Sequence, residues 1–193
     1  MQMNVLRYLP SDENAVTTLL RALCALKPIR EAVVRLFTQN NFGANDVELE
    51  EVSTQFDIGE AIPDMCLQTD ALRAVVEIKV SDLRGLTPNQ PQNYLRWLAS
   101  QPIHHKFFVF LVPPHYVHRQ EYESRKVAFC AENPHHEIHF VEITWLNVCA
   151  VLDETGLSTT SIYAHDFKNL LEEWYMSIPI TFTLDELQEI YHV

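Results

Sequence analysis

Two carboxylates and a lysine near the middle of the chain have the types and spacing that best suit a chemical role. Asp64 follows Pro63, and after a short polar turn residues 75–80 read Val-Val-Glu-Ile-Lys-Val, which includes Glu77 and Lys79. Carboxylate oxygens are ligands that suit Mg²⁺ and Mn²⁺, and a neighbouring lysine can stabilise negative charge or orient a water. This set therefore suits metal-dependent hydrolysis of a phosphodiester bond.

A β-hairpin would bring these side chains together. If its turn is centred on Asp70 and Ala71, Asp64 lies opposite Glu77. Directly opposed Cβ atoms in an antiparallel pair are about 5 Å apart, which lets two carboxylates share one ion. Lys79 projects from the same face as Glu77, because strand side chains alternate with a period of two. The opposite face then carries apolar side chains: Ala74, Val76, Ile78 and Val80.

Helices and strands alternate around this hairpin. Apolar spacing and capping residues predict helices near 12–26, 28–39, 90–100, 119–131, 145–152 and 161–176, and strands over 47–56, 62–68, 74–80, 107–112 and 138–142. A last short helix begins at Thr183, where Glu186 completes a capping box. The 107–112 segment is apolar throughout, which is typical of a strand covered on both faces. We expect an α/β protein, a three-layer sandwich with a mixed central sheet flanked by helices.

The order of these motifs resembles the PD-(D/E)XK nuclease superfamily, which has the restriction-endonuclease-like fold. Asp64 after a proline and Glu77-Ile78-Lys79 at the end of the next strand carry the resemblance. Gln90-x-x-x-Tyr94 is similar to the element of the RecB-like and lambda-exonuclease-like branches. Glu13-Asn14 with Thr17 is similar to the start of several bacterial members. The resemblance covers about residues 11–145.

The resemblance implies a metal centre that holds one or two Mg²⁺ or Mn²⁺ ions. Asp64 would bridge or ligate the ions, Glu77 would complete the carboxylate set, and the backbone carbonyl of Ile78 would supply another oxygen. Lys79 would orient the attacking water or stabilise charge on the phosphate. Glu13 would ligate an ion directly or through water. Because acids are favoured in any first helical turn, Glu13 is equally well explained as a helix-dipole partner.

Gln90 and Tyr94 complete the set of site residues that the resemblance implies. They would fix the position of the motif lysine or contact the phosphate backbone. Each also has a purely structural explanation. Thr87, Pro88 and Gln90 have the spacing of a helix capping box, and Tyr94 suits the core as an aromatic.

Length and composition indicate one domain with a short extension. The chain has 193 residues, of which 47% are hydrophobic, and this is enough for one sizeable core. We expect a nuclease-like core with N-terminal helices over residues 1–155 and a helical appendage packed on it over residues 156–193. No apolar run reaches the roughly 18 residues of a membrane span, and the N-terminus lacks a secretory pattern. We therefore expect no membrane contact, a cytoplasmic location and reduced cysteines.

The formal net charge of −12 argues against nucleic-acid binding, because phosphate contacts are normally made by basic residues. We expect the positive side chains near the substrate to offset this charge: Arg73, Lys79, Arg84, Arg96 and Lys106. On this interpretation the substrate is nucleic acid, DNA rather than RNA, in bacterial or phage defence, restriction or repair. The alternative is a catalytically silent interaction module on the same fold. For the nuclease, specificity would come from a homodimer or a partner protein.

Other chemistries have weaker support in the sequence. His135, His136 and His139 lack the spacing of a zinc site, and His104 with His105 would instead line the substrate cleft. No Gly-x-Ser-x-Gly elbow occurs, and the four glycines form no phosphate-binding P-loop. A serine hydrolase and a nucleotide-hydrolysing enzyme are therefore disfavoured.

Overall fold

The computed structural model describes residues 12–43, 47–59 and 61–175. Its centre is a five-stranded mixed sheet with the spatial order β1-β2-β3-β4-β5. The strands are β1 (Val52–Thr54), β2 (Met65–Gln68), β3 (Leu72–Ile78), β4 (His105–Val112) and β5 (Ile138–Thr144). β2 runs antiparallel to both of its neighbours, β1 and β3, whereas β4 pairs parallel with β3 and β5 pairs parallel with β4.

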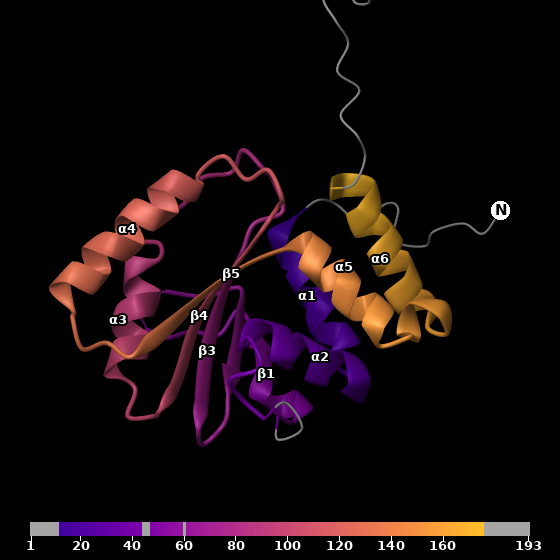
Figure 1. Cartoon of the computed structure of the whole chain (residues 1–193), viewed down its shortest axis with the longest axis horizontal. Helices are drawn as coiled ribbons and strands as arrows, with labels where there is room; N and C mark the ends of the chain where they lie inside the picture. The colour runs from indigo at the N-terminus through magenta and orange to yellow at the C-terminus, as the bar shows by residue number, and fades with distance from the viewer. Residues whose placement is uncertain (1–11, 44–46, 60, 176–193) are drawn as a thin grey trace, which may run out of the picture.

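Helices cover both faces of this sheet (Figure 1). One face carries α1 (Glu13–Leu23), α2 (Lys27–Phe37), α5 (Trp145–Glu154) and α6 (Ile162–Tyr175). The other face carries α3 (Gln92–Ser100) and α4 (Arg119–Glu132). Short 3₁₀ turns η2 (Leu49–Glu51) and η3 (Leu157–Thr159) complete the described elements. The predicted α/β class and mixed central sheet are confirmed.

The two hydrophobic cores follow from the alternation of side chains along β3. Ala74, Val76 and Ile78 pack in the core shared with α1, α2, α5 and α6, while Val75 packs with the aromatic side chains beneath α3 and α4. β4 lies between β3 and β5, and its residues from 106 to 112 are all buried. The apolar run predicted this burial for 107–112. Burying each large apolar side chain stabilises the fold by about 1.5–3 kcal/mol.

The predicted hairpin register is confirmed. Cys66 pairs with Val75 and Gln68 with Arg73, and the Thr69 N–H donates to the Leu72 carbonyl across the turn. β2 begins at Met65 and not at residue 62 as predicted, because residues 62–64 are not paired in the sheet. This places Asp64 at the mouth of the hairpin.

Other boundaries also differ from the prediction, and β3 spans 72–78 instead of 74–80. The 47–56 strand is reduced to β1, since residues 49–51 form η2 instead. The first helix ends at Leu23, because Leu26 is extended and caps α2. The third predicted helix begins at Gln92, after a cis Gln90–Pro91 peptide bond, so the 87–90 box does not open it. The helix expected at Thr183 lies outside the described residues.

The charged residues expected near the substrate do not gather in one place. Arg73 pairs in register with Lys106, and Leu72 with His105, at the start of β3. Because a strand rises about 3.3 Å per residue, this end lies about 20 Å from Lys79. The expectations for Arg73, Lys106 and His105 were wrong, since the parallel crossover brings the start of β4 to the opposite end of the sheet.

No helix within the described ranges is long and apolar enough to cross a bilayer.

Candidate functional site

Asp64 lies against the end of β3. Its Oδ2 accepts a hydrogen bond of 2.7 Å from the backbone N–H of Ile78. The neighbouring register pair, Met65 with Val76, places Asp64 and Glu77 at the next opposed position. The hairpin therefore holds two carboxylates side by side at the edge where β3 ends.

Lys79 joins these acids to the first helix. Its Nζ lies 2.6 Å from Glu77 Oε1 and 3.6 Å from Glu13 Oε2, and all three side chains are almost fully buried. Glu13 is the first residue of α1, where Asp12 caps the helix by accepting from the Asn14 N–H. The structure thus brings together Glu13, Asp64, Glu77 and Lys79, from three separate segments of the chain.

The C-terminal helices hold the backbone of this strand end. The Trp145 indole N–H donates to the Lys79 carbonyl over 2.8 Å, and the Tyr175 hydroxyl donates to the Val80 carbonyl over 2.7 Å. The two rings are nearly parallel, with centroids 6.4 Å apart. Sequence reasoning did not find these contacts, because residues 66 and 95 positions apart are paired only by the fold.

Arg84 is the second cation of the site. Its Nη1 lies 3.3 Å from Glu13 Oε2, although the Arg84 side chain is otherwise exposed. The residue belongs to the loop that follows β3. Its closeness to Lys79 in the sequence was the feature from which its position near the site could be predicted. Of the cations expected near the substrate, Lys79 and Arg84 are the two with ion pairs in this acidic cluster.

Gln90 and Tyr94 lie beside the cluster and bind each other. Gln90 Nε2 donates to the Tyr94 hydroxyl over 3.2 Å, and that hydroxyl donates to the Ile62 carbonyl. Gln90 Oε1 accepts from the Thr87 N–H, as the capping spacing predicted, although no helix begins there. Burial raises the pKa of Tyr94, and the charge of nearby Glu77 raises it further. The pair therefore supports the loop before α3, and the Tyr94 hydroxyl lies near Glu77.

Burial perturbs the ionisation of the whole cluster. It raises the pKa of Asp64 to about 6, although the Ile78 N–H and Lys79 oppose the shift. Burial and the charge of Asp64 raise the pKa of Glu77 to about 8. Burial alone would lower the pKa of Lys79, but the charges of Glu77, Glu13 and Asp64 outweigh it and raise the pKa. Three acids compete for two cations, so the site favours another positive charge.

The residues present fit a hard divalent cation in their donor chemistry. Glu13 Oε1 and Glu77 Oε2 are buried and have no hydrogen-bond partner. An unsatisfied buried polar group costs about 1–3 kcal/mol, which a bound cation would relieve. Within residues 12–43, 47–59 and 61–175, no three His, Cys, Asp or Glu side chains already form a metal-binding cluster. A cation bound here would compete for Glu77 with Lys79, whose Nζ lies 2.6 Å from Glu77 Oε1.

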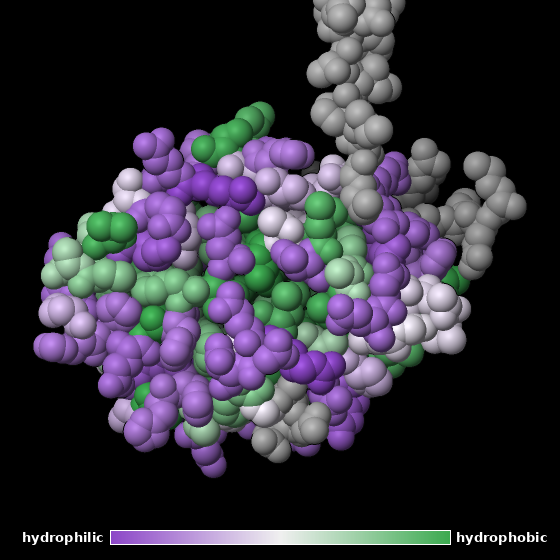
Figure 2. All heavy atoms as spheres, in the orientation of Figure 1, coloured by the Kyte–Doolittle hydropathy of each residue, from purple (hydrophilic) through white to green (hydrophobic). Residues whose placement is uncertain are grey.

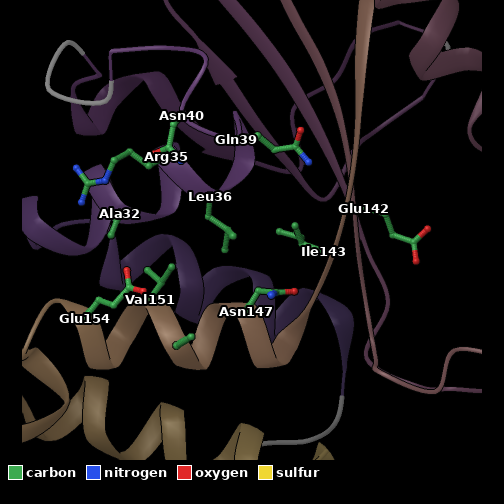
Figure 3. Close-up of a pocket in the computed structure, with 11 residues that line it drawn as sticks. Ala32, Arg35, Leu36, Gln39, Asn40, Glu142, Ile143, Asn147, Val151 and Glu154 are labelled. Carbon is green, nitrogen blue, oxygen red and sulfur yellow. The ribbon is translucent and has the colours of Figure 1, made fainter.

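A hollow of about 500 Å³ lies away from these residues, among α2, α5 and β5 (Figure 3). Leu36, Ile143 and Asn147 line its interior, and Arg35 and Glu154 lie at its edge. The acidic cluster contributes none of the residues that line it. The hollow is thus separate from the candidate metal site.

Known proteins offer no assignment for this site. No protein-family model, no curated protein and no solved structure matches the chain. Its function must therefore be argued from the geometry of Glu13, Asp64, Glu77 and Lys79.

Proposed function

We propose that this chain is a metal-dependent nuclease with a restriction-endonuclease-like fold, which hydrolyses phosphodiester bonds in DNA. The observation that supports the proposal best is the cluster of Asp64 with the buried Glu13 and Glu77 around Lys79 at the end of β3. The mixed sheet between two helical layers is compatible with that fold. A purely structural ion pair would not need three acids, two of them with unpartnered buried oxygens.

Each residue has a defined task in this proposal. Asp64, Glu77 and Glu13, with the Ile78 carbonyl, would hold Mg²⁺ or Mn²⁺. The bound ion would polarise the phosphate and lower the pKa of an attacking water. Lys79 would exchange its hydrogen bond with Glu77 for one with a phosphate oxygen, where its charge stabilises the transition state. Burial of its side chain restricts the directions in which this amine can donate.

The proposal is tested by incubating the chain with linear, circular and single-stranded DNA and with RNA, in Mg²⁺, Mn²⁺ or EDTA. We expect metal-dependent cleavage of DNA, reduced at least about 100-fold in Asp64→Asn and Lys79→Met, since each removes charge from the reacting centre. Asp70→Asn is the matched control, because Asp70 is exposed in the turn at the far end of the same hairpin. Equal, metal-independent inertness of wild type and variants would contradict the proposal.

A second function is supported by the way Lys79 is already neutralised. Its 2.6 Å pair with Glu77, together with the net charge of −12, suits a catalytically silent module that binds a protein partner. The two functions predict different metal responses. A nuclease is stabilised by Mn²⁺ through Glu77, whereas the silent module melts at the same temperature with Mn²⁺ or EDTA.

A further inference from the structure

Two exposed apolar side chains lie in neighbouring loops next to the acidic cluster. Leu83, in the loop after β3, is 76% exposed, and Val117, in the loop after β4, is 58% exposed. The Val117 N–H donates to the Asp82 carbonyl over 3.1 Å, and His118 Nε2 lies 3.0 Å from the Leu83 carbonyl oxygen. The two loops are therefore side by side, and we name Leu83 and Val117 together the apolar tip.

The apolar tip is held out in solvent by its surroundings. The buried Tyr116 donates its hydroxyl to the Arg84 carbonyl over 3.0 Å, and Arg125 donates to the Thr87 carbonyl over 2.6 Å. Single exposed apolar residues are ordinary on protein surfaces. Leu83 and Val117 differ from scattered ones because the hydrogen bonds between their two loops hold both near each other. Hydrophobic side chains are seen projecting at the upper edge of the molecule in Figure 2, where Figure 1 has these loops.

The tip is connected to the candidate metal site through one residue. Arg84 follows Leu83 directly, and its guanidinium contacts Glu13 Oε2 over 3.3 Å. Both loops also leave the sheet at the carboxyl ends of the parallel strands β3 and β4, where the candidate site lies. Any polymer bound across the acidic cluster would therefore pass close to the tip.

We propose that the apolar tip inserts between neighbouring bases of DNA bound at the candidate site and unstacks them. This inference rests on the proposed function, and it names how the same site engages its substrate. Apolar side chains act in this way when they enter a groove and open a base step. The contact also suits an acidic protein, because bases are neutral, whereas phosphate contacts are weakened by a net charge of −12.

The partner that the observations favour is nucleic acid rather than a protein or a lipid surface. Arg84 adjoins the tip and offers a cation to a backbone phosphate, in the manner of other single-strand and groove contacts. The tip consists of only two side chains, which is small for a protein interface of the usual size. Insertion at one base step needs no larger apolar area.

The test uses a short duplex with 2-aminopurine, whose fluorescence rises on unstacking, and Ca²⁺ as the hard cation in the binding buffer. We expect wild type to raise the fluorescence, and the double variant Leu83→Ser, Val117→Ser to lose most of the rise and bind about 10-fold more weakly. Val127→Ser is the matched control, because Val127 is a 62% exposed valine on α4. Circular dichroism melts verify that all variants are folded.

The outcomes separate this inference from the proposed function. Cleavage in Mg²⁺ with an equal fluorescence rise in wild type and the double variant overturns the inference and leaves the nuclease standing. A tip-dependent rise without any cleavage supports the inference and counts against the nuclease. Absence of binding to duplex or single-stranded DNA, or tip-dependent binding to phospholipid vesicles in place of DNA, overturns the insertion at bases.

Discussion

Charged residues lie at both ends of β3, but the hydrogen bonding of their side chains differs. At its start, Arg73 donates to the carbonyls of Thr69 and Leu72, and Lys106 Nζ lies 3.4 Å from the Ala99 carbonyl. At its end, Glu77 and Glu13 each keep a buried oxygen without a partner while sharing Lys79. Charges that backbone carbonyls satisfy serve the fold, whereas the far end retains unsatisfied carboxylate oxygens for a ligand.

Removal of the lysine at each end of β3 should have the largest effect. Lys79→Met leaves buried carboxylates without their cation, which we expect to cost about 3–5 kcal/mol in the free energy of unfolding at pH 8. Lys106→Met removes one long hydrogen bond and should cost about 1 kcal/mol or less. Urea unfolding of both variants measures the difference. Equal losses of unfolding free energy in the two variants would contradict the proposed difference between the two ends of β3.

Addition of metal should act at one end only. If Mn²⁺ binds the folded state alone, a concentration 100 times the dissociation constant stabilises the wild type by about 2.7 kcal/mol. We expect Glu77→Gln to abolish this gain and the exposed turn variant Asp70→Asn to retain it. Thermal melts with Mn²⁺ and with EDTA provide the measurement. If Mn²⁺ also raises the melting temperature of Glu77→Gln, the ion binds at another site.

The pH dependence of stability should report the same acids. The pKa values of Asp64 and Glu77, about 6 and about 8, lie above their ordinary values of 3.8 and 4.5. The folded state therefore holds extra protons, so this stabilisation is complete below about pH 4 and is lost as the pH rises to about 8. We expect the metal-free protein to lose stability steadily over this range.

A variant and a metal ion should each change this pH dependence. Glu77→Gln should flatten the loss above about pH 6, because its amide does not titrate, whereas Asp70→Asn should follow the wild type. Mn²⁺ should reverse the slope, since metal binding requires the deprotonated carboxylates. Metal-free stability that rises between pH 5 and pH 8 would contradict the raised pKa values.

The hairpin was predictable from sequence because parity and a two-residue turn fix its register, and Cys66 opposite Val75 follows directly. The position of His105 and Lys106 was not, because local patterns do not say which end of a parallel crossover faces the site. The helix start at Gln92 was missed for a local reason, since capping residues at 87–90 are used in a turn that precedes the helix. Residue spacing predicts contacts within a helix or a hairpin. Contacts between more distant segments depend on how the fold arranges them.

The smallest expected effect concerns the layer that supports the site. Tyr175→Phe removes the hydroxyl that donates to the Val80 carbonyl, one residue after Lys79, and should cost about 1 kcal/mol in urea unfolding. Tyr163→Phe, at a 61% exposed tyrosine of the same helix, should cost almost nothing. If Tyr175 only stabilises α6, Mn²⁺ affinity is unchanged in Tyr175→Phe. A weaker affinity would show that the C-terminal helix positions the strand end that carries Lys79, and that the contrast between the two ends of β3 depends on α6.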